Sequence, residues 1–146
     1  MESRYLYRGK RVDTGEWVEG SLVTGVFFRL GQEIPYMFCP NLADYDCFED
    51  FSEENGIFEV DPSTICKCTG LQDKNGNLIW ENDICDRKEQ YPEIVKYRDG
   101  DWTLDYSYAI HKESGDCYCN LGFYTEERKC AEVIGNIFDN PELLEV

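Results

Sequence analysis

The chain has 146 residues, and its 30 Asp and Glu against 14 Lys and Arg give a formal net charge of −16 at pH 7. Such a negative surface repels phosphates and anionic lipids, so we expect neither direct nucleic-acid binding nor membrane binding. No apolar run approaches the ~20 residues that a membrane-spanning helix needs, and residues 1–7 lack the pattern of a leader peptide, which predicts a cytoplasmic protein.

Two β-hairpins are predicted near the start of the chain. Aromatic residues make up 14% of the sequence, and their rings pack well on a pleated sheet. A turn signal at Gly15 lies between segments 5–9 and 17–23, which are predicted to pair as the first hairpin. A turn signal at Gly31 lies between segments 26–30 and 34–38, which are predicted to pair as the second. Pro35 donates no backbone N–H, so the second return strand is expected near a sheet edge.

An acidic segment follows the hairpins. Residues 41–56 are predicted to form an exposed loop with at most one helical turn, because apolar residues give way to Asp44, Asp46, Glu49, Asp50, Glu53 and Glu54.

Short strands joined by tight turns are predicted from residue 57 onwards. Asn75-Gly76 and Asp99-Gly100 are turn signals because these residues accept a positive φ, and Asn82 marks a further bend. The strands are predicted at 57–60, in the segment before Asp73, and at 78–80, 83–87, 93–97, 102–106 and 131–137, with one helical turn at 141–144.

This pattern predicts a mainly β fold, α+β at most. Residues 60–146 are expected to form a small half-open or closed barrel of about five strands, similar to the Src-homology-3 type. Residues 1–59 would supply N-terminal hairpins and the acidic loop as an extension. We expect both parts to unfold as one cooperative unit.

Two motifs resemble a known protein family. Thr69-Gly70-Leu71 precedes Asp73-Lys74-Asn75-Gly76 and then Ile79, Glu81 and Asp83-Ile84, and the chain closes with Val133-Ile134-Gly135-Asn136-Ile137 and Asn140-Pro141-Glu142-Leu143-Leu144. Together they resemble the YopX family of small phage and prophage proteins, which has no assigned activity. The resemblance implies a phage or prophage origin, the cytoplasm of a bacterial host, and self-association.

The chain departs from the family pattern at four positions. Asn82 stands where glycine is usual, and because asparagine tolerates a positive φ the bend is expected to survive. Lys67 stands where glutamine is common, which leaves open whether a shared binding site has changed. Cys68 and Cys85 replace an aromatic and an aliphatic residue, which implies core roles for both.

Eight cysteines are expected to be free thiols in a cytoplasmic chain. Two pairs have C-x-C spacing, which places two sulfurs on the same side of a strand; they are Cys66 with Cys68, and Cys117 with Cys119. A four-thiolate zinc site is one hypothesis, although common zinc knuckles use C-x-x-C. The alternative is that these cysteines pack as small apolar residues.

The sequence predicts no catalytic residue, no cofactor and no metal. Phosphate-binding, dinucleotide-binding and nucleophile-elbow motifs are missing from it. The single histidine, His111, has no nucleophile motif nearby and is predicted on a surface loop. Asp73, Glu81 and Asp83 lie near one turn and would be the ligands of a carboxylate-metal nuclease, but carboxylates at turns more often accept backbone hydrogen bonds.

The leading functional hypothesis is a non-enzymatic phage accessory protein that binds another protein or assembles with itself. Its contact surface would be an open sheet edge with the rings of Phe27, Phe28, Tyr36 and Phe38. The partner would be a second copy of the chain, or a host or phage protein. Two alternatives stay open: an acidic nucleic-acid mimic that uses residues 44–54 to block a host protein, and the metal nuclease.

Overall fold

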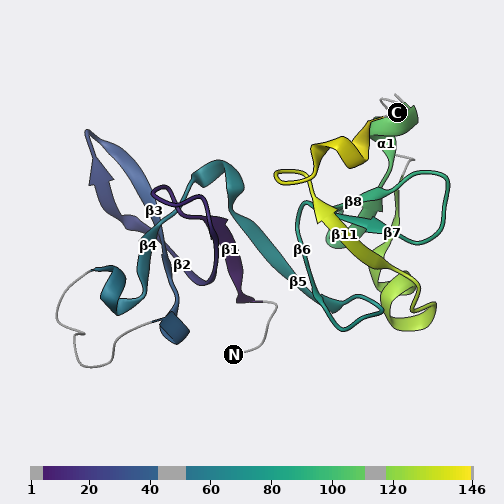
Figure 1. Cartoon of the computed structure of the whole chain (residues 1–146), viewed down its shortest axis with the longest axis horizontal. Helices are drawn as coiled ribbons and strands as arrows, with labels where there is room; N and C mark the ends of the chain where they lie inside the picture. Colours follow the sequence, from purple (N-terminus) through teal and green to yellow (C-terminus); the bar gives the residue numbers. More distant parts are fainter. Residues whose placement is uncertain (1–4, 43–51, 111–117, 146) are drawn as a thin grey trace. The chain divides into compact units, whose positions relative to one another are not determined.

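A computed structural model describes residues 5–42, 52–110 and 118–145 of the chain (Figure 1). The chain divides into two compact units, residues 1–67 and residues 68–146. The boundary predicted between residues 59 and 60 and the expected unfolding as one unit stay predictions.

The described residues form eleven β-strands in two antiparallel sheets. The strands are β1 (Tyr7–Lys10), β2 (Trp17–Arg29), β3 (Gln32–Phe38), β4 (Ile57–Glu59), β5 (Cys66–Gln72), β6 (Leu78–Trp80), β7 (Asp83–Asp86), β8 (Glu93–Arg98), β9 (Asp101–Asp105), β10 (Tyr118–Asn120) and β11 (Glu132–Asn136). The six-stranded sheet has the order β4-β3-β2-β1-β5-β6, and the five-stranded sheet has the order β10-β9-β8-β7-β11.

Helical segments are short throughout the described residues. They are the 3-10 turns η2 (Pro40–Leu42), η4 (Glu53–Asn55), η5 (Pro62–Thr64) and η7 (Pro141–Leu144), the α-helical turn α1 (Ser107–Ile110) and the π-helical turn η6 (Phe123–Glu127). Within the described ranges, no helix has the length and apolar character that crossing a membrane requires.

The mainly β class predicted from the sequence is confirmed. The five-stranded sheet is open in the described part of the chain, with β10 and β11 at its edges, so the closed form of the predicted barrel is not present there. Strand β10 and the π-helical turn η6 were not predicted. The predicted turn at Asp99-Gly100 is present, with φ of +52° and +84° at its two residues.

Both predicted hairpins are present in the first unit. Strand β1 pairs with β2 around a turn in which Gly15 has a φ of +74°. Strand β2 is longer than expected because it continues through a bulge, where Gly25 has a φ of +75° and its N–H donates to the Glu33 carboxylate. The segment 26–30, predicted as the first strand of the second hairpin, is therefore mostly the far half of β2.

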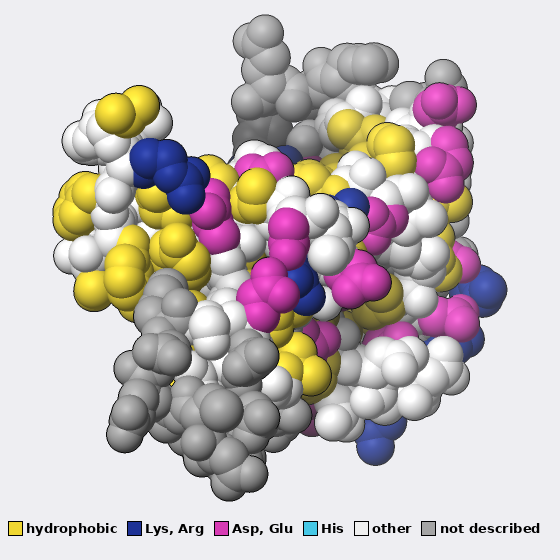
Figure 2. Space-filling view, turned by 60° about the vertical axis from the view of Figure 1, so that its left-hand side comes forward, with side chains coloured by type: hydrophobic (Ala, Val, Ile, Leu, Met, Phe, Trp, Pro, Cys, Tyr) yellow, Lys and Arg dark blue, Asp and Glu magenta, His cyan; other side chains and the backbone are white. Residues whose placement is uncertain are grey.

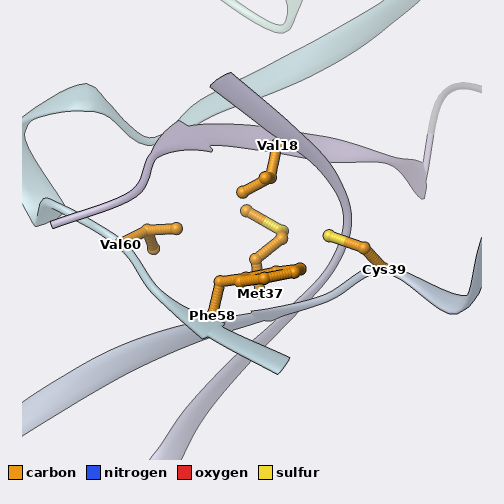
Figure 3. Close-up of a cluster of buried hydrophobic side chains, with 5 residues drawn as sticks. All are labelled: Val18, Met37, Cys39, Phe58 and Val60. Atoms are coloured by element: carbon orange, nitrogen blue, oxygen red, sulfur yellow. The ribbon is translucent and has the colours of Figure 1, made fainter. Parts of the chain in front are cut away.

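A separate buried cluster fills each unit. In the first unit the cluster is formed by side chains from β2, β3 and β4 and from the residues just after β3 and β4. Its members are Val18, Met37, Cys39, Phe58 and Val60 (Figure 3). In the second unit it is Ile79, Cys85, Val95, Leu104 and Leu121. Burial of a large apolar side chain contributes roughly 1.5–3 kcal/mol, so these clusters are the main source of stability in each unit.

Gly20 marks the closest backbone approach in the first unit. A Cβ atom at this position would lie 2.0 Å from the Phe38 carbonyl oxygen, and backbone cannot move aside as a flexible side chain can. Only glycine therefore allows β2 and the end of β3 to approach this closely.

We predict that Gly20→Ala lowers the free energy of unfolding by at least about 2 kcal/mol, because the added methyl group forces β2 and β3 apart. Urea unfolding followed by tryptophan fluorescence measures this loss. Ser21→Ala, at the next position of the same strand, is the control and should change stability by less than about 0.5 kcal/mol. Equal stability of Gly20→Ala and the parent protein would contradict the close approach.

Candidate functional site

Asp73 is a buried carboxylate that organises the predicted Asn75-Gly76 turn. Its side chain accepts hydrogen bonds from the backbone N–H groups of Asn75 and Asn77, both at 2.9 Å, and from that of Val133 at 3.0 Å. Burial raises the pKa of Asp73, but these hydrogen bonds outweigh it, so the pKa lies below its ordinary value. Asp73 has the backbone-capping role expected for carboxylates at turns.

The same turn is attached to the segment just before and within β11. Lys74 donates its backbone N–H to the Ala131 carbonyl at 2.9 Å, and its ammonium lies 3.3 Å from the Glu132 carboxylate. Asn75 donates its side-chain amide to Glu132 at 3.3 Å. The turn motif and the final strand, 60 residues apart in sequence at Asp73 and Val133, therefore form one hydrogen-bonded assembly.

The bend at Asn82 joins the two motifs a second time. Asn82 has a φ of +71°, so asparagine adopts here the conformation expected of the family glycine. Its carbonyl accepts the Ile137 backbone N–H at 3.1 Å. The neighbouring Asp83 side chain is buried and accepts the Trp80 backbone N–H at 2.8 Å.

Gly135 lies at a bulge in β11. The pairing of β11 with β7 shifts register between Val133 and Gly135. A Cβ at Gly135 would lie 2.5 Å from Asn140 Oδ1, which accepts the Asn136 backbone N–H at 3.2 Å. The bulge and the close contact with the Asn140 side chain therefore both favour glycine at this position.

Two of the three candidate nuclease carboxylates have structural partners. Asp73 and Asp83 are held by backbone N–H groups, as described above. Across residues 5–42, 52–110 and 118–145, no three His, Cys, Asp or Glu side chains are placed to hold a metal ion together.

The cysteines of the described residues are free thiols, most of them buried. Cys66 and Cys68 are buried on either side of the exposed Lys67, so they point to the same side of β5 as predicted. Burial raises the pKa of Cys39 to about 11 and that of Cys119 to about 12, which leaves both thiols protonated at neutral pH. Cys117, the fourth member of the hypothetical zinc site, lies outside the described residues.

Two other predicted features fall mostly outside the described residues. His111 is one of them. The acidic stretch 44–50 is the other, and only its continuation is described, where the Glu53 carboxylate lies 3.1 Å from the Arg11 guanidinium. The prediction of a nucleic-acid mimic therefore falls mostly on residues outside the described ranges.

The far end of the β2–β3 hairpin, residues 24–34, exposes apolar side chains and is called the hairpin end below. Val26 and Phe28 are each 61% exposed, and Leu30 is completely exposed. Phe27 and Tyr36 are half-buried and pack edge to face, with ring centroids 4.9 Å apart. Figure 2 shows hydrophobic side chains gathered on one lobe of the surface. Of the rings predicted for a contact surface, Phe28 is the most exposed.

Leu30 is the residue that the sequence reasoning missed. It occupies the hairpin turn with Gly31, and the two residues have φ of +50° and +80°. Turns of this geometry favour Asn-Gly, because a leucine Cβ is crowded at positive φ. The signal was available in the sequence, since a large apolar residue directly precedes the turn glycine.

Both edges of the hairpin end lack a further strand within the described part of the chain. Strand β1 covers β2 only from Trp17 to Gly20, and β4 covers β3 only from Tyr36 to Phe38. Figure 1 shows the hairpin continuing beyond both neighbours. An edge of this kind presents backbone donors and acceptors to a partner chain.

The chain is a small, mainly β protein with two antiparallel sheets, in which the Asn75-Gly76 turn is hydrogen-bonded to the last strand, β11. Residues 6–145 match the family described as YopX protein, and the chain belongs to the YopX family.

A solved structure has a similar fold. The crystal structure of protein EF1440 from Enterococcus faecalis matches with a TM-score of 0.51 and 24% sequence identity, over 95% of this chain and 96% of that chain. At this identity the likeness concerns the fold alone. No curated protein matches the chain.

We predict that Asp73→Asn lowers the free energy of unfolding by about 2 kcal/mol at pH 7, because the amide cannot accept every backbone bond that the carboxylate accepts. The pKa of Asp73 is lower in the folded state, so its stabilisation is present above the unfolded pKa and is lost as the pH falls through the folded pKa. The difference between variant and parent should therefore shrink below about pH 4.

Urea unfolding at neutral and acidic pH measures this difference. Glu127→Gln, an exposed carboxylate in the same unit, is the control and should change stability by less than about 0.5 kcal/mol. A difference between Asp73→Asn and the parent that is the same at both pH values would contradict the account.

Proposed function

We propose that this YopX-family protein is a non-enzymatic accessory module that assembles with a second copy of itself through the hairpin end. Family membership supports a role in a phage or prophage, and with it the cytoplasm of a bacterial host as the place of action. The observation that carries the proposal is Leu30, fully exposed at a positive φ.

The position of Leu30 works against folding. A left-handed conformation costs a residue with a Cβ roughly 1–2 kcal/mol, and a side chain that stays in water recovers none of this by burial. Asparagine would suit the turn better. Strain of this kind supports a role in binding a partner and not in stabilising the fold. Burial against that partner would supply the missing apolar contact.

The charge of the hairpin end suits self-association. The hairpin end contains two charged side chains of opposite sign, Arg29 and Glu33, in a chain of net charge −16. The Arg29 guanidinium lies 3.0 Å from the Glu59 carboxylate, which offsets its charge. Two hairpin ends therefore repel each other less than other parts of this acidic chain would.

The two open edges supply a geometry for the contact. Backbone groups of residues 24–34 that face away from the hairpin can form the hydrogen bonds of an added strand. Val26 and Phe28 would be covered at the same time. Such an interface combines apolar burial with directional bonds, which fixes register as well as affinity.

We predict that Leu30→Asn weakens self-association while it stabilises the folded chain. Removal of the exposed leucine should raise the dissociation constant at least about tenfold, because burial of one such side chain contributes about 1.5–3 kcal/mol. Relief of the turn strain should raise the free energy of unfolding by about 1 kcal/mol. Sedimentation equilibrium and thermal unfolding measure the two effects.

Val12→Thr is the matched control for this experiment, since Val12 is 57% exposed and lies in the same unit but outside the hairpin end. It should leave the solution mass unchanged. A parent protein that is monomeric at its highest soluble concentration, or a Leu30→Asn variant that associates as tightly as the parent, would overturn the proposal.

A further inference from the structure

The second unit contains a cavity of about 240 Å³ between the end of β7, the start of β8 and α1. It is independent of the hairpin end, which belongs to the first unit. Its walls include Arg87, Glu89, Tyr91, Glu93, Tyr106 and Ile110. Two carboxylates, two phenol rings and one aliphatic side chain therefore face a space large enough for a small organic group.

The guanidinium of Arg87 is already engaged by the carboxylates of the cavity. Its Nε donates to Glu93 at 2.6 Å, and its Nη1 donates to Glu89 at 3.0 Å. The guanidinium also stacks 4.3 Å from the ring centre of Tyr124. With its donors directed at carboxylates and one face on a ring, Arg87 is not available to bind an anion.

The charged groups of the cavity leave a net negative charge. Glu89 and Glu93 carry two negative charges against the single positive charge of Arg87. Glu93 is only 2% exposed, so its charge is poorly screened by water. Burial raises the pKa of Glu93 and the bonds from Arg87 oppose this rise, so a second cation nearby would further favour the ionised carboxylate.

The uncharged walls suit a cation that carries an apolar stem. Tyr91 and Tyr106 contribute aromatic side chains, a type whose rings attract cations, and Ile110 contributes an aliphatic one. The Glu89 side chain is 58% exposed, so this carboxylate is accessible from solvent. The acidic charge of the whole chain also raises the local concentration of cations.

We propose that this cavity binds an organic cation, a primary ammonium group on an aliphatic stem. The ammonium would lie between Glu89 and the tyrosine rings, and the stem would pack on Ile110. This chemistry occurs in free alkylamines and in lysine side chains of a peptide, and the experiment below separates these two sources.

Titration of the full-length protein with pentylamine, followed by amide chemical shifts, tests the proposal. Saturable binding with shifts at residues 87–93 and 106–110 is expected. Pentanol and pentanoate have a stem of the same length without the positive charge and should bind at least about tenfold more weakly. Nα-acetyl-lysine methylamide is the second cationic probe, and tighter binding of it than of pentylamine identifies a peptide lysine as the natural ligand.

Two variants locate the site. Glu89→Gln should weaken pentylamine binding at least about tenfold, and Tyr91→Leu should weaken it severalfold through loss of one ring face. Glu16→Gln, which makes the same charge change at an exposed position of the first unit, should bind like the parent. Absence of saturable binding, equal binding of pentanol, or full affinity in Glu89→Gln would overturn the proposal without bearing on the hairpin end.

Discussion

The buried Asp73 carboxylate is the interaction on which the second unit depends. A carboxylate that is 6% exposed is costly unless hydrogen bonds replace its water, and here the backbone supplies them from its own turn and from β11. The two segments that carry the family motifs are therefore held together by this side chain, together with the backbone bonds from Lys74 to Ala131 and from Ile137 to Asn82. The motif residues Asp73 and Asn82 therefore have structural roles in the second unit.

The two proposed binding surfaces lie away from those motifs. The hairpin end exposes an apolar side chain at a strained turn, and the cavity beside Arg87 gathers charge and aromatic rings outside both motifs. Each feature carries a cost to the folded chain, in backbone strain at Leu30 and in desolvation at Glu93. Features that cost stability are the reasonable places to look for binding.

Local turn chemistry made much of the fold predictable. The backbone geometry at some positions can be inferred from the residue type, since few residues accept a positive φ or a close approach. Such positions are Asn75-Gly76, Asp99-Gly100 and Gly135. The path of β2 through Gly25 was not predictable, because the Glu33 carboxylate that holds the bulge comes from the partner strand. The cavity was also beyond sequence reasoning, since Arg87 and Glu93 meet only when β7 pairs with β8.

The central claim is that Asp73 acts as a buried, charged acceptor that ties the turn to β11. The most direct measurement is an NMR titration of the Asp73 side-chain carboxyl carbon, combined with hydrogen exchange at the Val133 amide. The account predicts a titration midpoint below that of an unstructured aspartate and a Val133 amide that exchanges slowly. A midpoint at or above the ordinary aspartate value, together with rapid exchange at Val133, would contradict it.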